Sequence, residues 1–109
     1  MIPTGAALGA ELTGVDLSRL DEAAFERMHW AWLAHEVLLF RDQQLTDSDL
    51  IVFSEYMGSL EQAPIQETGR RFVEGYPEIY VVSNVIENDV PIGSLGAGEA
   101  VWHTDMSYL

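Results

Sequence analysis

The residue types best suited to chemistry in this chain are His103 and Asp105, which lie two positions apart in the stretch VWHTDMSY at 101–108. That stretch is typical of a β-strand, in which residues i and i+2 point to the same face. An imidazole and a carboxylate on one face are two of the three ligands of the facial triad that holds non-haem Fe(II). A second histidine would have to complete the triad. The spacing alone also fits an ordinary hydrogen-bonded pair.

The segments before this pair must bring it into place. Residues 78–83 are β-branched or aromatic at most positions and predict a strand. Asn88 and Asp89 predict a turn, and residues 91–98 predict a glycine-rich connection that gives the chain freedom to approach the strand carrying His103. This connection is not a phosphate-binding loop, because no Gly-Lys-Ser/Thr follows it.

The first half of the chain predicts two helices. Residues 22–35 carry one apolar stripe, with Trp30 and Trp32 as core and flanking side chains. Thr46 and Asp49 have the spacing of a capping box that opens a second helix at 47–57, followed by Gly58. The stripes comprise Phe25, Met28, Trp32 and His35 in the first helix and Leu50, Phe53 and Met57 in the second.

The remaining segments predict strands and loops. Residues 8–12 alternate apolar and polar side chains and predict a short strand that ends at a turn at Gly14, and the apolar run 37–40 predicts a fully buried strand. Residues 61–77 contain several glycines and prolines and predict a long loop. In that loop Arg70 and Arg71 are interpreted as solvated side chains rather than an anion site. His29 and His35, six apart on a helix, point in different directions and are interpreted as packing or surface residues.

Composition limits the classes of function. The chain has 109 residues, a length that predicts at most one domain, and 48% of them are apolar, which is enough for a modest core. It contains no cysteine, so thiolate metal sites and disulfides are excluded. Five basic and 18 acidic residues give a net charge of −13, which disfavours nucleic acid and anionic membranes as partners. The start of the chain has no signal-peptide pattern, so we expect a cytoplasmic protein.

Four stretches resemble the N-terminal part of the taurine/chlorophenoxyacetate dioxygenase family, whose members are Fe(II)- and 2-oxoglutarate-dependent oxygenases. The resemblance covers nearly the whole chain, and its most specific part is Trp-His-Thr-Asp at 102–105. The stretches are LGAELTGVDL at 8–17, HEVLLFRDQ at 35–43, FSEYMGSLE at 53–61 and WHTDMSY at 102–108.

The resemblance implies an α+β fold in which helices flank a double-stranded β-helix, or jelly roll. Residues 1–109 would be the N-terminal portion of a single oxygenase domain, truncated before the third iron ligand. His103 and Asp105 would be the first two iron ligands, and no other catalytic residue is expected in the chain. The third ligand and the residues that bind 2-oxoglutarate would lie downstream of Leu109.

The resemblance also bears on the substrate. Taurine-specific members carry a histidine and an asparagine where this chain has Ala63 and Glu99. A glutamate would repel a sulfonate, so we do not expect taurine as the substrate. Met106 follows the iron-binding aspartate and is a candidate for lining the substrate pocket, with core packing as the alternative.

The function implied is hydroxylation of a small organic substrate at a C–H bond, with dioxygen and 2-oxoglutarate as co-substrates and with release of succinate and CO2. This portion alone is expected to be inactive. Assembly into a homo-oligomer is compatible with the sequence. The main alternative is a non-catalytic α+β binding or structural domain whose His-x-Asp pair is incidental. A cupin-type metal enzyme is a third alternative, ranked last because such enzymes usually cluster several histidines on adjacent strands.

Overall fold

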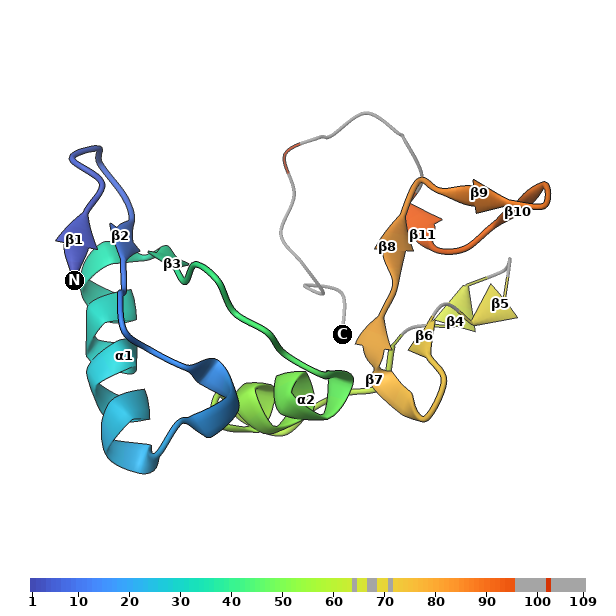
Figure 1. Cartoon of the computed structure of the whole chain (residues 1–109). Coiled ribbons are helices and arrows are strands. Elements are labelled where there is room, and N and C mark those ends of the chain that lie inside the picture. Colours follow the sequence, from blue (N-terminus) through green and yellow to red (C-terminus); the bar gives the residue numbers. More distant parts are fainter. Residues whose placement is uncertain (64, 67–68, 71, 96–101, 103–109) are drawn as a thin grey trace. The chain divides into compact units, whose positions relative to one another are not determined.

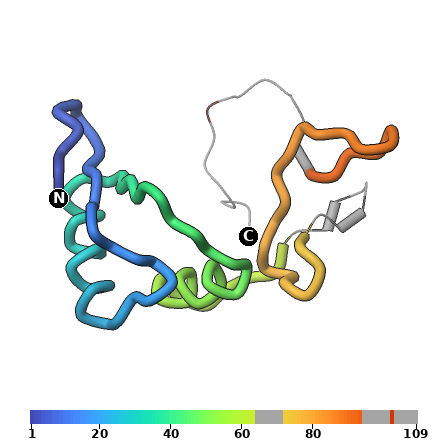
Figure 2. The backbone as a smooth tube through the Cα atoms, in the orientation of Figure 1, coloured from blue at the N-terminus to red at the C-terminus, as the bar shows by residue number. Residues whose placement is uncertain are grey.

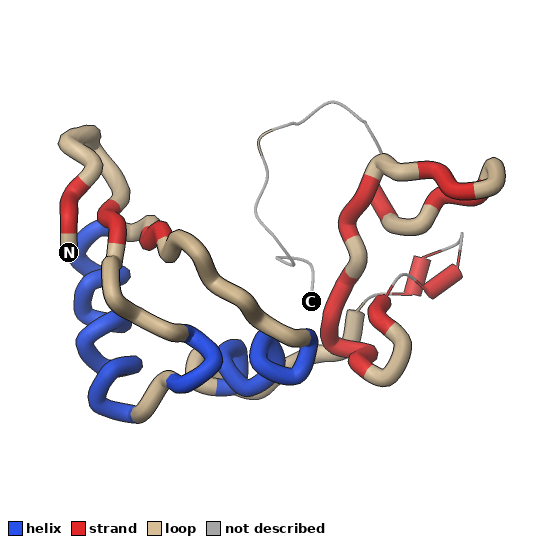
Figure 3. The backbone as a smooth tube through the Cα atoms, in the orientation of Figure 1, coloured by secondary structure: helices blue, strands red, loops and turns tan. Residues whose placement is uncertain are grey.

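The structure is a computed structural model that describes residues 1–63, 65–66, 69–70, 72–95 and 102. At residues 65–66, 69–70 and 94–95 it describes only the backbone. The chain divides into unit 1, Met1–Leu60, and unit 2, Glu61–Leu109. All described helices lie in unit 1, and the described regular elements of unit 2 are strands (Figure 1, Figure 3). The expected mixture of helix and strand is confirmed.

Unit 1 is built on a three-stranded sheet in the order β1-β2-β3. Strand β1 (Ile2–Pro3) pairs antiparallel with β2 (Ala10–Glu11), which pairs parallel with β3 (Leu38–Leu39). The crossover from β2 to β3 contains a 3-10 helix, η1 (Leu17–Arg19), and helix α1 (Glu22–His35). Parallel neighbours require such a long connection, and Figure 2 follows its path.

Helix α1 has the bounds that the sequence predicts. Asp21 caps its N-terminus, with a carboxylate oxygen that accepts a hydrogen bond from the backbone N–H of Ala24 at 2.7 Å. The helix ends at His35, because the C-cap residue Glu36 has a φ of 64° that is incompatible with further helix. The Trp32 indole then donates to the Glu36 carbonyl at 2.9 Å, which satisfies a backbone acceptor at this end.

Helix α2 (Asp47–Glu55) begins with the predicted capping box. The backbone N–H of Asp49 donates to the Thr46 hydroxyl at 3.2 Å, and the Asp49 carboxylate accepts from the Thr46 backbone N–H at 2.9 Å. The helix is shorter than predicted at its C-terminal end. Tyr56 and Met57 close it with bonds to carbonyls three residues back, and Gly58 has a φ of 143°, outside the left-handed helical region of a C′ glycine.

The described part of the chain buries few apolar side chains. Only Ala10, Leu17 and Met28 are buried hydrophobic residues among the described positions. The prediction of a fully buried strand at 37–40 is wrong, because Val37 is 55% exposed and only two residues of this run pair as strand. Trp30 was expected in the core or on its flank, yet it is 71% exposed.

The prediction of a loop over residues 61–77 is wrong for the residues that the structure describes. The backbone forms two short hairpins there, β4 (Ile65–Gln66) with β5 (Gly69–Arg70), and β6 (Phe72–Val73) with β7 (Tyr76–Tyr80). Gly75 has a φ of 85° in the turn between β6 and β7, so the glycine that suggested a loop instead permits a hairpin turn. The side chains of Arg70 and Arg71 lie outside the described set.

The predicted strand at 78–83 is confirmed but interrupted, since β7 ends at Tyr80 and β8 comprises Val82–Ser83. The turn predicted at Asn88 and Asp89 is confirmed. Their φ values of 49° and 63° place both residues in the left-handed region, as a type I′ turn requires. This turn joins the antiparallel strands β9 (Ile86–Glu87) and β10 (Val90–Pro91).

Candidate functional site

The predicted metal ligands His103 and Asp105 lie outside the residues that the structure describes, as do Glu99 and Met106. Their roles therefore stay predictions. Trp102, in the most specific motif of the sequence, is described and is fully exposed outside any strand. The strand predicted over 101–108 is otherwise outside the described set.

Unit 2 shows how the backbone is organised just before the candidate ligands. Strand β11 (Ser94–Leu95) pairs parallel with β8, so the chain folds back onto β8 after the β9–β10 hairpin. Gly93 makes this return feasible. A Cβ at Gly93 would lie 2.7 Å from both the backbone nitrogen and the Cβ of Ser83, closer than real Cβ atoms approach. The glycine-rich connection of the sequence thus includes one position where backbone contact requires glycine.

The other histidines of the chain do not form a metal site. The His29 ring lies 5.7 Å from the Phe25 ring and 5.9 Å from the Trp32 ring, measured between centroids, so it packs within an aromatic row on α1. His35 is partly buried at the end of the same helix. Within the described ranges, no group of three or more His, Cys, Asp or Glu side chains could hold a metal ion.

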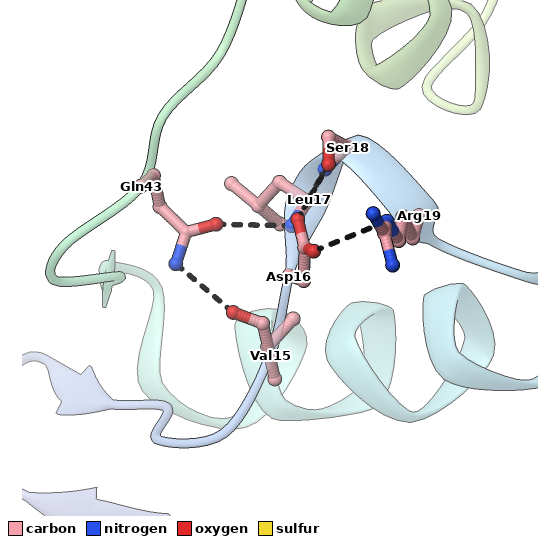
Figure 4. A network of polar contacts seen from close by, with 6 residues as sticks. All are labelled: Val15, Asp16, Leu17, Ser18, Arg19 and Gln43. Carbon is pink, nitrogen blue, oxygen red and sulfur yellow. Dashed lines mark hydrogen bonds and ion pairs between the residues drawn. The ribbon is translucent and has the colours of Figure 1, made fainter.

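A polar network in unit 1 centres on Gln43, which the sequence did not single out (Figure 4). Its side-chain oxygen accepts from the Leu17 backbone N–H and its side-chain nitrogen donates to the Val15 carbonyl, each at 2.9 Å. The amide nitrogen also donates to the Arg41 carbonyl at 2.9 Å. Both ends of the Gln43 amide are therefore engaged with backbone, and the network fixes η1 to the segment that follows β3.

Asp16 belongs to the same network. Its carboxylate accepts from the Ser18 hydroxyl at 2.7 Å and from the Ser18 backbone N–H at 3.0 Å. These hydrogen bonds, together with the guanidinium of Arg19, lower the pKa of Asp16 below its ordinary value. A carboxylate held ionised by local donors in this way is a structural cap for η1 rather than a general acid.

An apolar groove lies in unit 1 between α1, β3 and the region of α2, and we call it the α1–α2 groove. Its volume is about 180 Å³. The sequence predicted most of its residues as core stripes, but not that they would border a groove. It is lined by Met28, Trp32, Leu38, Phe40, Phe53 and Met57.

Ala63 is the one described residue among the positions that bear on substrate preference. Its backbone N–H donates to the Pro77 carbonyl at 2.8 Å, which ties the start of unit 2 to the beginning of β7. A methyl side chain offers no charge or hydrogen-bond donor to an anionic substrate.

Comparison with known families gives a match over residues 2–109 to the family described as taurine catabolism dioxygenase TauD, TfdA family. This match spans the four stretches on which the resemblance was based. No helix among the described residues is both long enough and apolar enough to cross a membrane.

Two characterised relatives and one solved structure show the same relationship. The chain is 33% identical to an (S)-phenoxypropionate/alpha-ketoglutarate-dioxygenase from Delftia acidovorans, over 98% of this chain and 36% of the relative. It is 32% identical to an alkylsulfatase from Acinetobacter baylyi, over 94% of this chain and 29% of the relative. A crystal structure from Burkholderia xenovorans, described as a "putative alpha-ketoglutarate-dependent taurine dioxygenase", superposes with a TM-score of 0.66 at 33% identity, over 80% of this chain and 30% of that one.

The chain thus spans about a third of the length of these relatives. Their names point to three different substrates, so sequence identities of 32–33% do not select one substrate for this chain.

Proposed function

The chain belongs to the TauD/TfdA family, and from this premise we propose that it forms the N-terminal third of an Fe(II)- and 2-oxoglutarate-dependent dioxygenase domain. The observation that carries the proposal is the family match over residues 2–109, which includes the Trp-His-Thr-Asp motif. The complete domain would have a jelly-roll core, with residues 1–109 as its first portion.

His103 and Asp105 would hold the iron. A neutral imidazole nitrogen and a carboxylate oxygen are the donor types that non-haem Fe(II) accepts, and a second histidine from the rest of the domain would complete the set. Bound iron would supply the activation of dioxygen. Asp105 would contribute a negative charge to the site. His103 would bind through one ring nitrogen, while the N–H of its other ring nitrogen would donate a hydrogen bond that fixes the ring.

The proposed reaction consumes one dioxygen and one 2-oxoglutarate for each substrate hydroxylated. One oxygen atom enters the C–H bond of a small organic substrate, and the other enters succinate as CO2 is released. Met106 and Glu99 are proposed to lie near the substrate. A carboxylate at position 99 would disfavour sulfonates such as taurine, because like charges repel at short range.

A chimera tests this proposal. Residues 1–109, with Glu99→Ala in every version because (S)-phenoxypropionate is itself an anion, would replace the matching first third of the Delftia acidovorans relative, and succinate formation from 2-oxoglutarate would be measured with Fe(II), air and (S)-phenoxypropionate. We expect succinate formation that falls to background in His103→Ala and in Asp105→Ala. His35→Ala and Asp89→Ala are matched controls that should retain it. A folded chimera whose succinate formation is unaffected by His103→Ala would contradict the proposal.

A further inference from the structure

The α1–α2 groove is lined by core-type side chains that unit 1 does not cover. Among the lining residues Met28 is only 3% exposed, whereas Trp32 and Met57 are 42% and 48% exposed. The stacked rings of Phe25 and Tyr56, 5.0 Å apart, connect α1 to the end of α2 beside these residues. Large apolar side chains gathered around one hollow indicate a surface that another apolar surface covers.

A small ligand does not fit this groove. Its volume of about 180 Å³ is well below the range of roughly 300–1,000 Å³ typical of small-molecule pockets. All six lining residues are apolar or aromatic, and the one side-chain donor among them, the Trp32 indole N–H, already donates to the Glu36 carbonyl. No described lining side chain is therefore left to orient a polar ligand.

Charge argues against two other occupants. The lining carries no charged side chain, so a basic partner would find no complementary group in the groove. A second copy would bring together two chains of net charge −13, which repel each other. The favoured occupant is an apolar polypeptide surface that belongs to the same domain.

We propose that the α1–α2 groove is the docking surface for apolar side chains of the other two thirds of a TauD/TfdA domain, whether that polypeptide is joined to this chain or separate. The inference rests on the proposed function, because the occupant is the part of such a domain that the relatives contain beyond the matched third. Docking would bury Trp32 and Met57.

Thiol labelling tests the proposal cleanly, because the chain has no cysteine of its own. Met57→Cys reports on the groove. Val52→Cys, on α2 and 54% exposed but not lining the groove, is the matched control. Each variant would be labelled with a maleimide both in the 109-residue chain and in the chimera with the Delftia acidovorans relative, with peptide mass mapping to assign the labelled site.

We expect the cysteine at position 57 to react at least about tenfold more slowly in the chimera than in the 109-residue chain, because a covered site reacts only after local opening. The cysteine at position 52 should react at similar rates in both. Equal rates at position 57 would overturn the proposal, as would an insoluble chimera when the parent relative is soluble. Protection of position 57 in the 109-residue chain that grows with its concentration would identify a second copy as the occupant, and so would also overturn it.

One further variant separates this inference from the proposed function. His103→Ala in the chimera should leave the protection of position 57 unchanged while it abolishes succinate formation. Protection without succinate formation in the unsubstituted chimera would therefore contradict the proposed function alone. Succinate formation without protection would contradict the docking surface alone.

Discussion

At the scale of single residues, Gln43 holds two separate segments of unit 1 together. Its side-chain amide forms hydrogen bonds with the backbone of Val15 and Leu17 in one segment and with the backbone of Arg41 in the other. Backbone groups that lose such a partner in a part-buried position must find water or remain unsatisfied, and the second outcome is costly. Gln43 is therefore a structural residue of the stretch that resembles the family, and needs no role in catalysis to be important.

We predict that Gln43→Ala lowers the free energy of unfolding of unit 1 by about 1–2 kcal/mol, because a backbone donor and acceptor lose their partner. Gln44→Ala is the matched control, since Gln44 is an exposed neighbour of the same type. Denaturant unfolding followed by hydrogen exchange at the Leu17 amide measures the effect. Equal stability of the two variants would show that water replaces the Gln43 amide without cost.

Gly93 gives a second prediction at this scale. We predict that Gly93→Ala separates β11 from β8, because the new methyl would lie 2.7 Å from the Ser83 backbone nitrogen and 3.0 Å from the Val81 carbonyl oxygen. Backbone atoms cannot move aside as a flexible side chain can. Faster amide hydrogen exchange in residues 82–83 and 94–95 is expected, with Ile92→Ala as the neighbouring control. Unchanged exchange in Gly93→Ala would mean that β8 and β11 do not approach this closely.

At the scale of elements, helix α2 depends on its capping box. The Thr46 hydroxyl donates to the Asp49 carboxylate at 2.7 Å, and the Thr46 backbone N–H donates to the same carboxylate oxygen. These two hydrogen bonds lower the pKa of Asp49 below its ordinary value, the hydroxyl having the larger effect. The carboxylate therefore stabilises the start of α2 in its ionised form.

The sign of the pH dependence follows from this shift. The folded-state pKa of Asp49 is lower than its unfolded value of about 3.9, so its stabilising effect is complete above that value and is lost as the pH falls through the folded-state pKa. We predict that Asp49→Asn reduces the loss of α2 helicity between about pH 5 and pH 2, a range that brackets that value. NMR amide shifts of α2 across this range measure it. An unchanged pH profile in Asp49→Asn would mean that other carboxylates control the acid response.

Removal of the Thr46 side chain tests the same box at neutral pH. Thr46→Ala should destabilise α2 by about 1 kcal/mol, the usual cost of losing an N-cap side chain. Ser48→Ala, in the first turn of the same helix, is the control and should have little effect. A larger effect in Ser48→Ala than in Thr46→Ala would contradict the assignment of Thr46 as the N-cap.

The helices were predictable because their signals are local. Asp21 and Thr46 are side-chain caps that act within three residues, and both helices begin where these residues place them. The strands were predicted less well because strand pairing depends on distant partners. Residues 61–77 contain turn-forming glycines that fit a loop or a hairpin equally well, and Val37 lies in an apolar run that only three-dimensional packing shows to be exposed.

The same contrast applies to the candidate site. The sequence predicted His103 and Asp105 as metal ligands from a spacing of two residues and from the family resemblance of residues 102–108, both of which are local information. It did not find Gln43, whose partners Val15 and Leu17 are 28 and 26 residues away. A contact of that separation leaves no periodic signal along the chain, so only the folded structure could reveal it.

At the scale of the whole molecule, the described part of the chain leaves much apolar surface exposed. Many large apolar residues in the described ranges remain exposed, including Trp30, Leu33 and Val82 at 71%, 59% and 60%. Single exposed apolar residues are ordinary, but a lining of six around one groove is not. Under the proposed docking, the additional polypeptide of relatives about three times as long as this chain would cover such surfaces.

The central proposal is that His103 and Asp105 hold Fe(II) in a domain of this family. Iron binding is its most direct test. The measurement is anaerobic titration of the chimera with Fe(II) in the presence of 2-oxoglutarate, followed by the absorbance band of the ternary complex. We predict saturation at one iron per chain, loss of the band in His103→Ala, and its retention in His35→Ala. A band of unchanged intensity in a folded His103→Ala chimera would contradict the account.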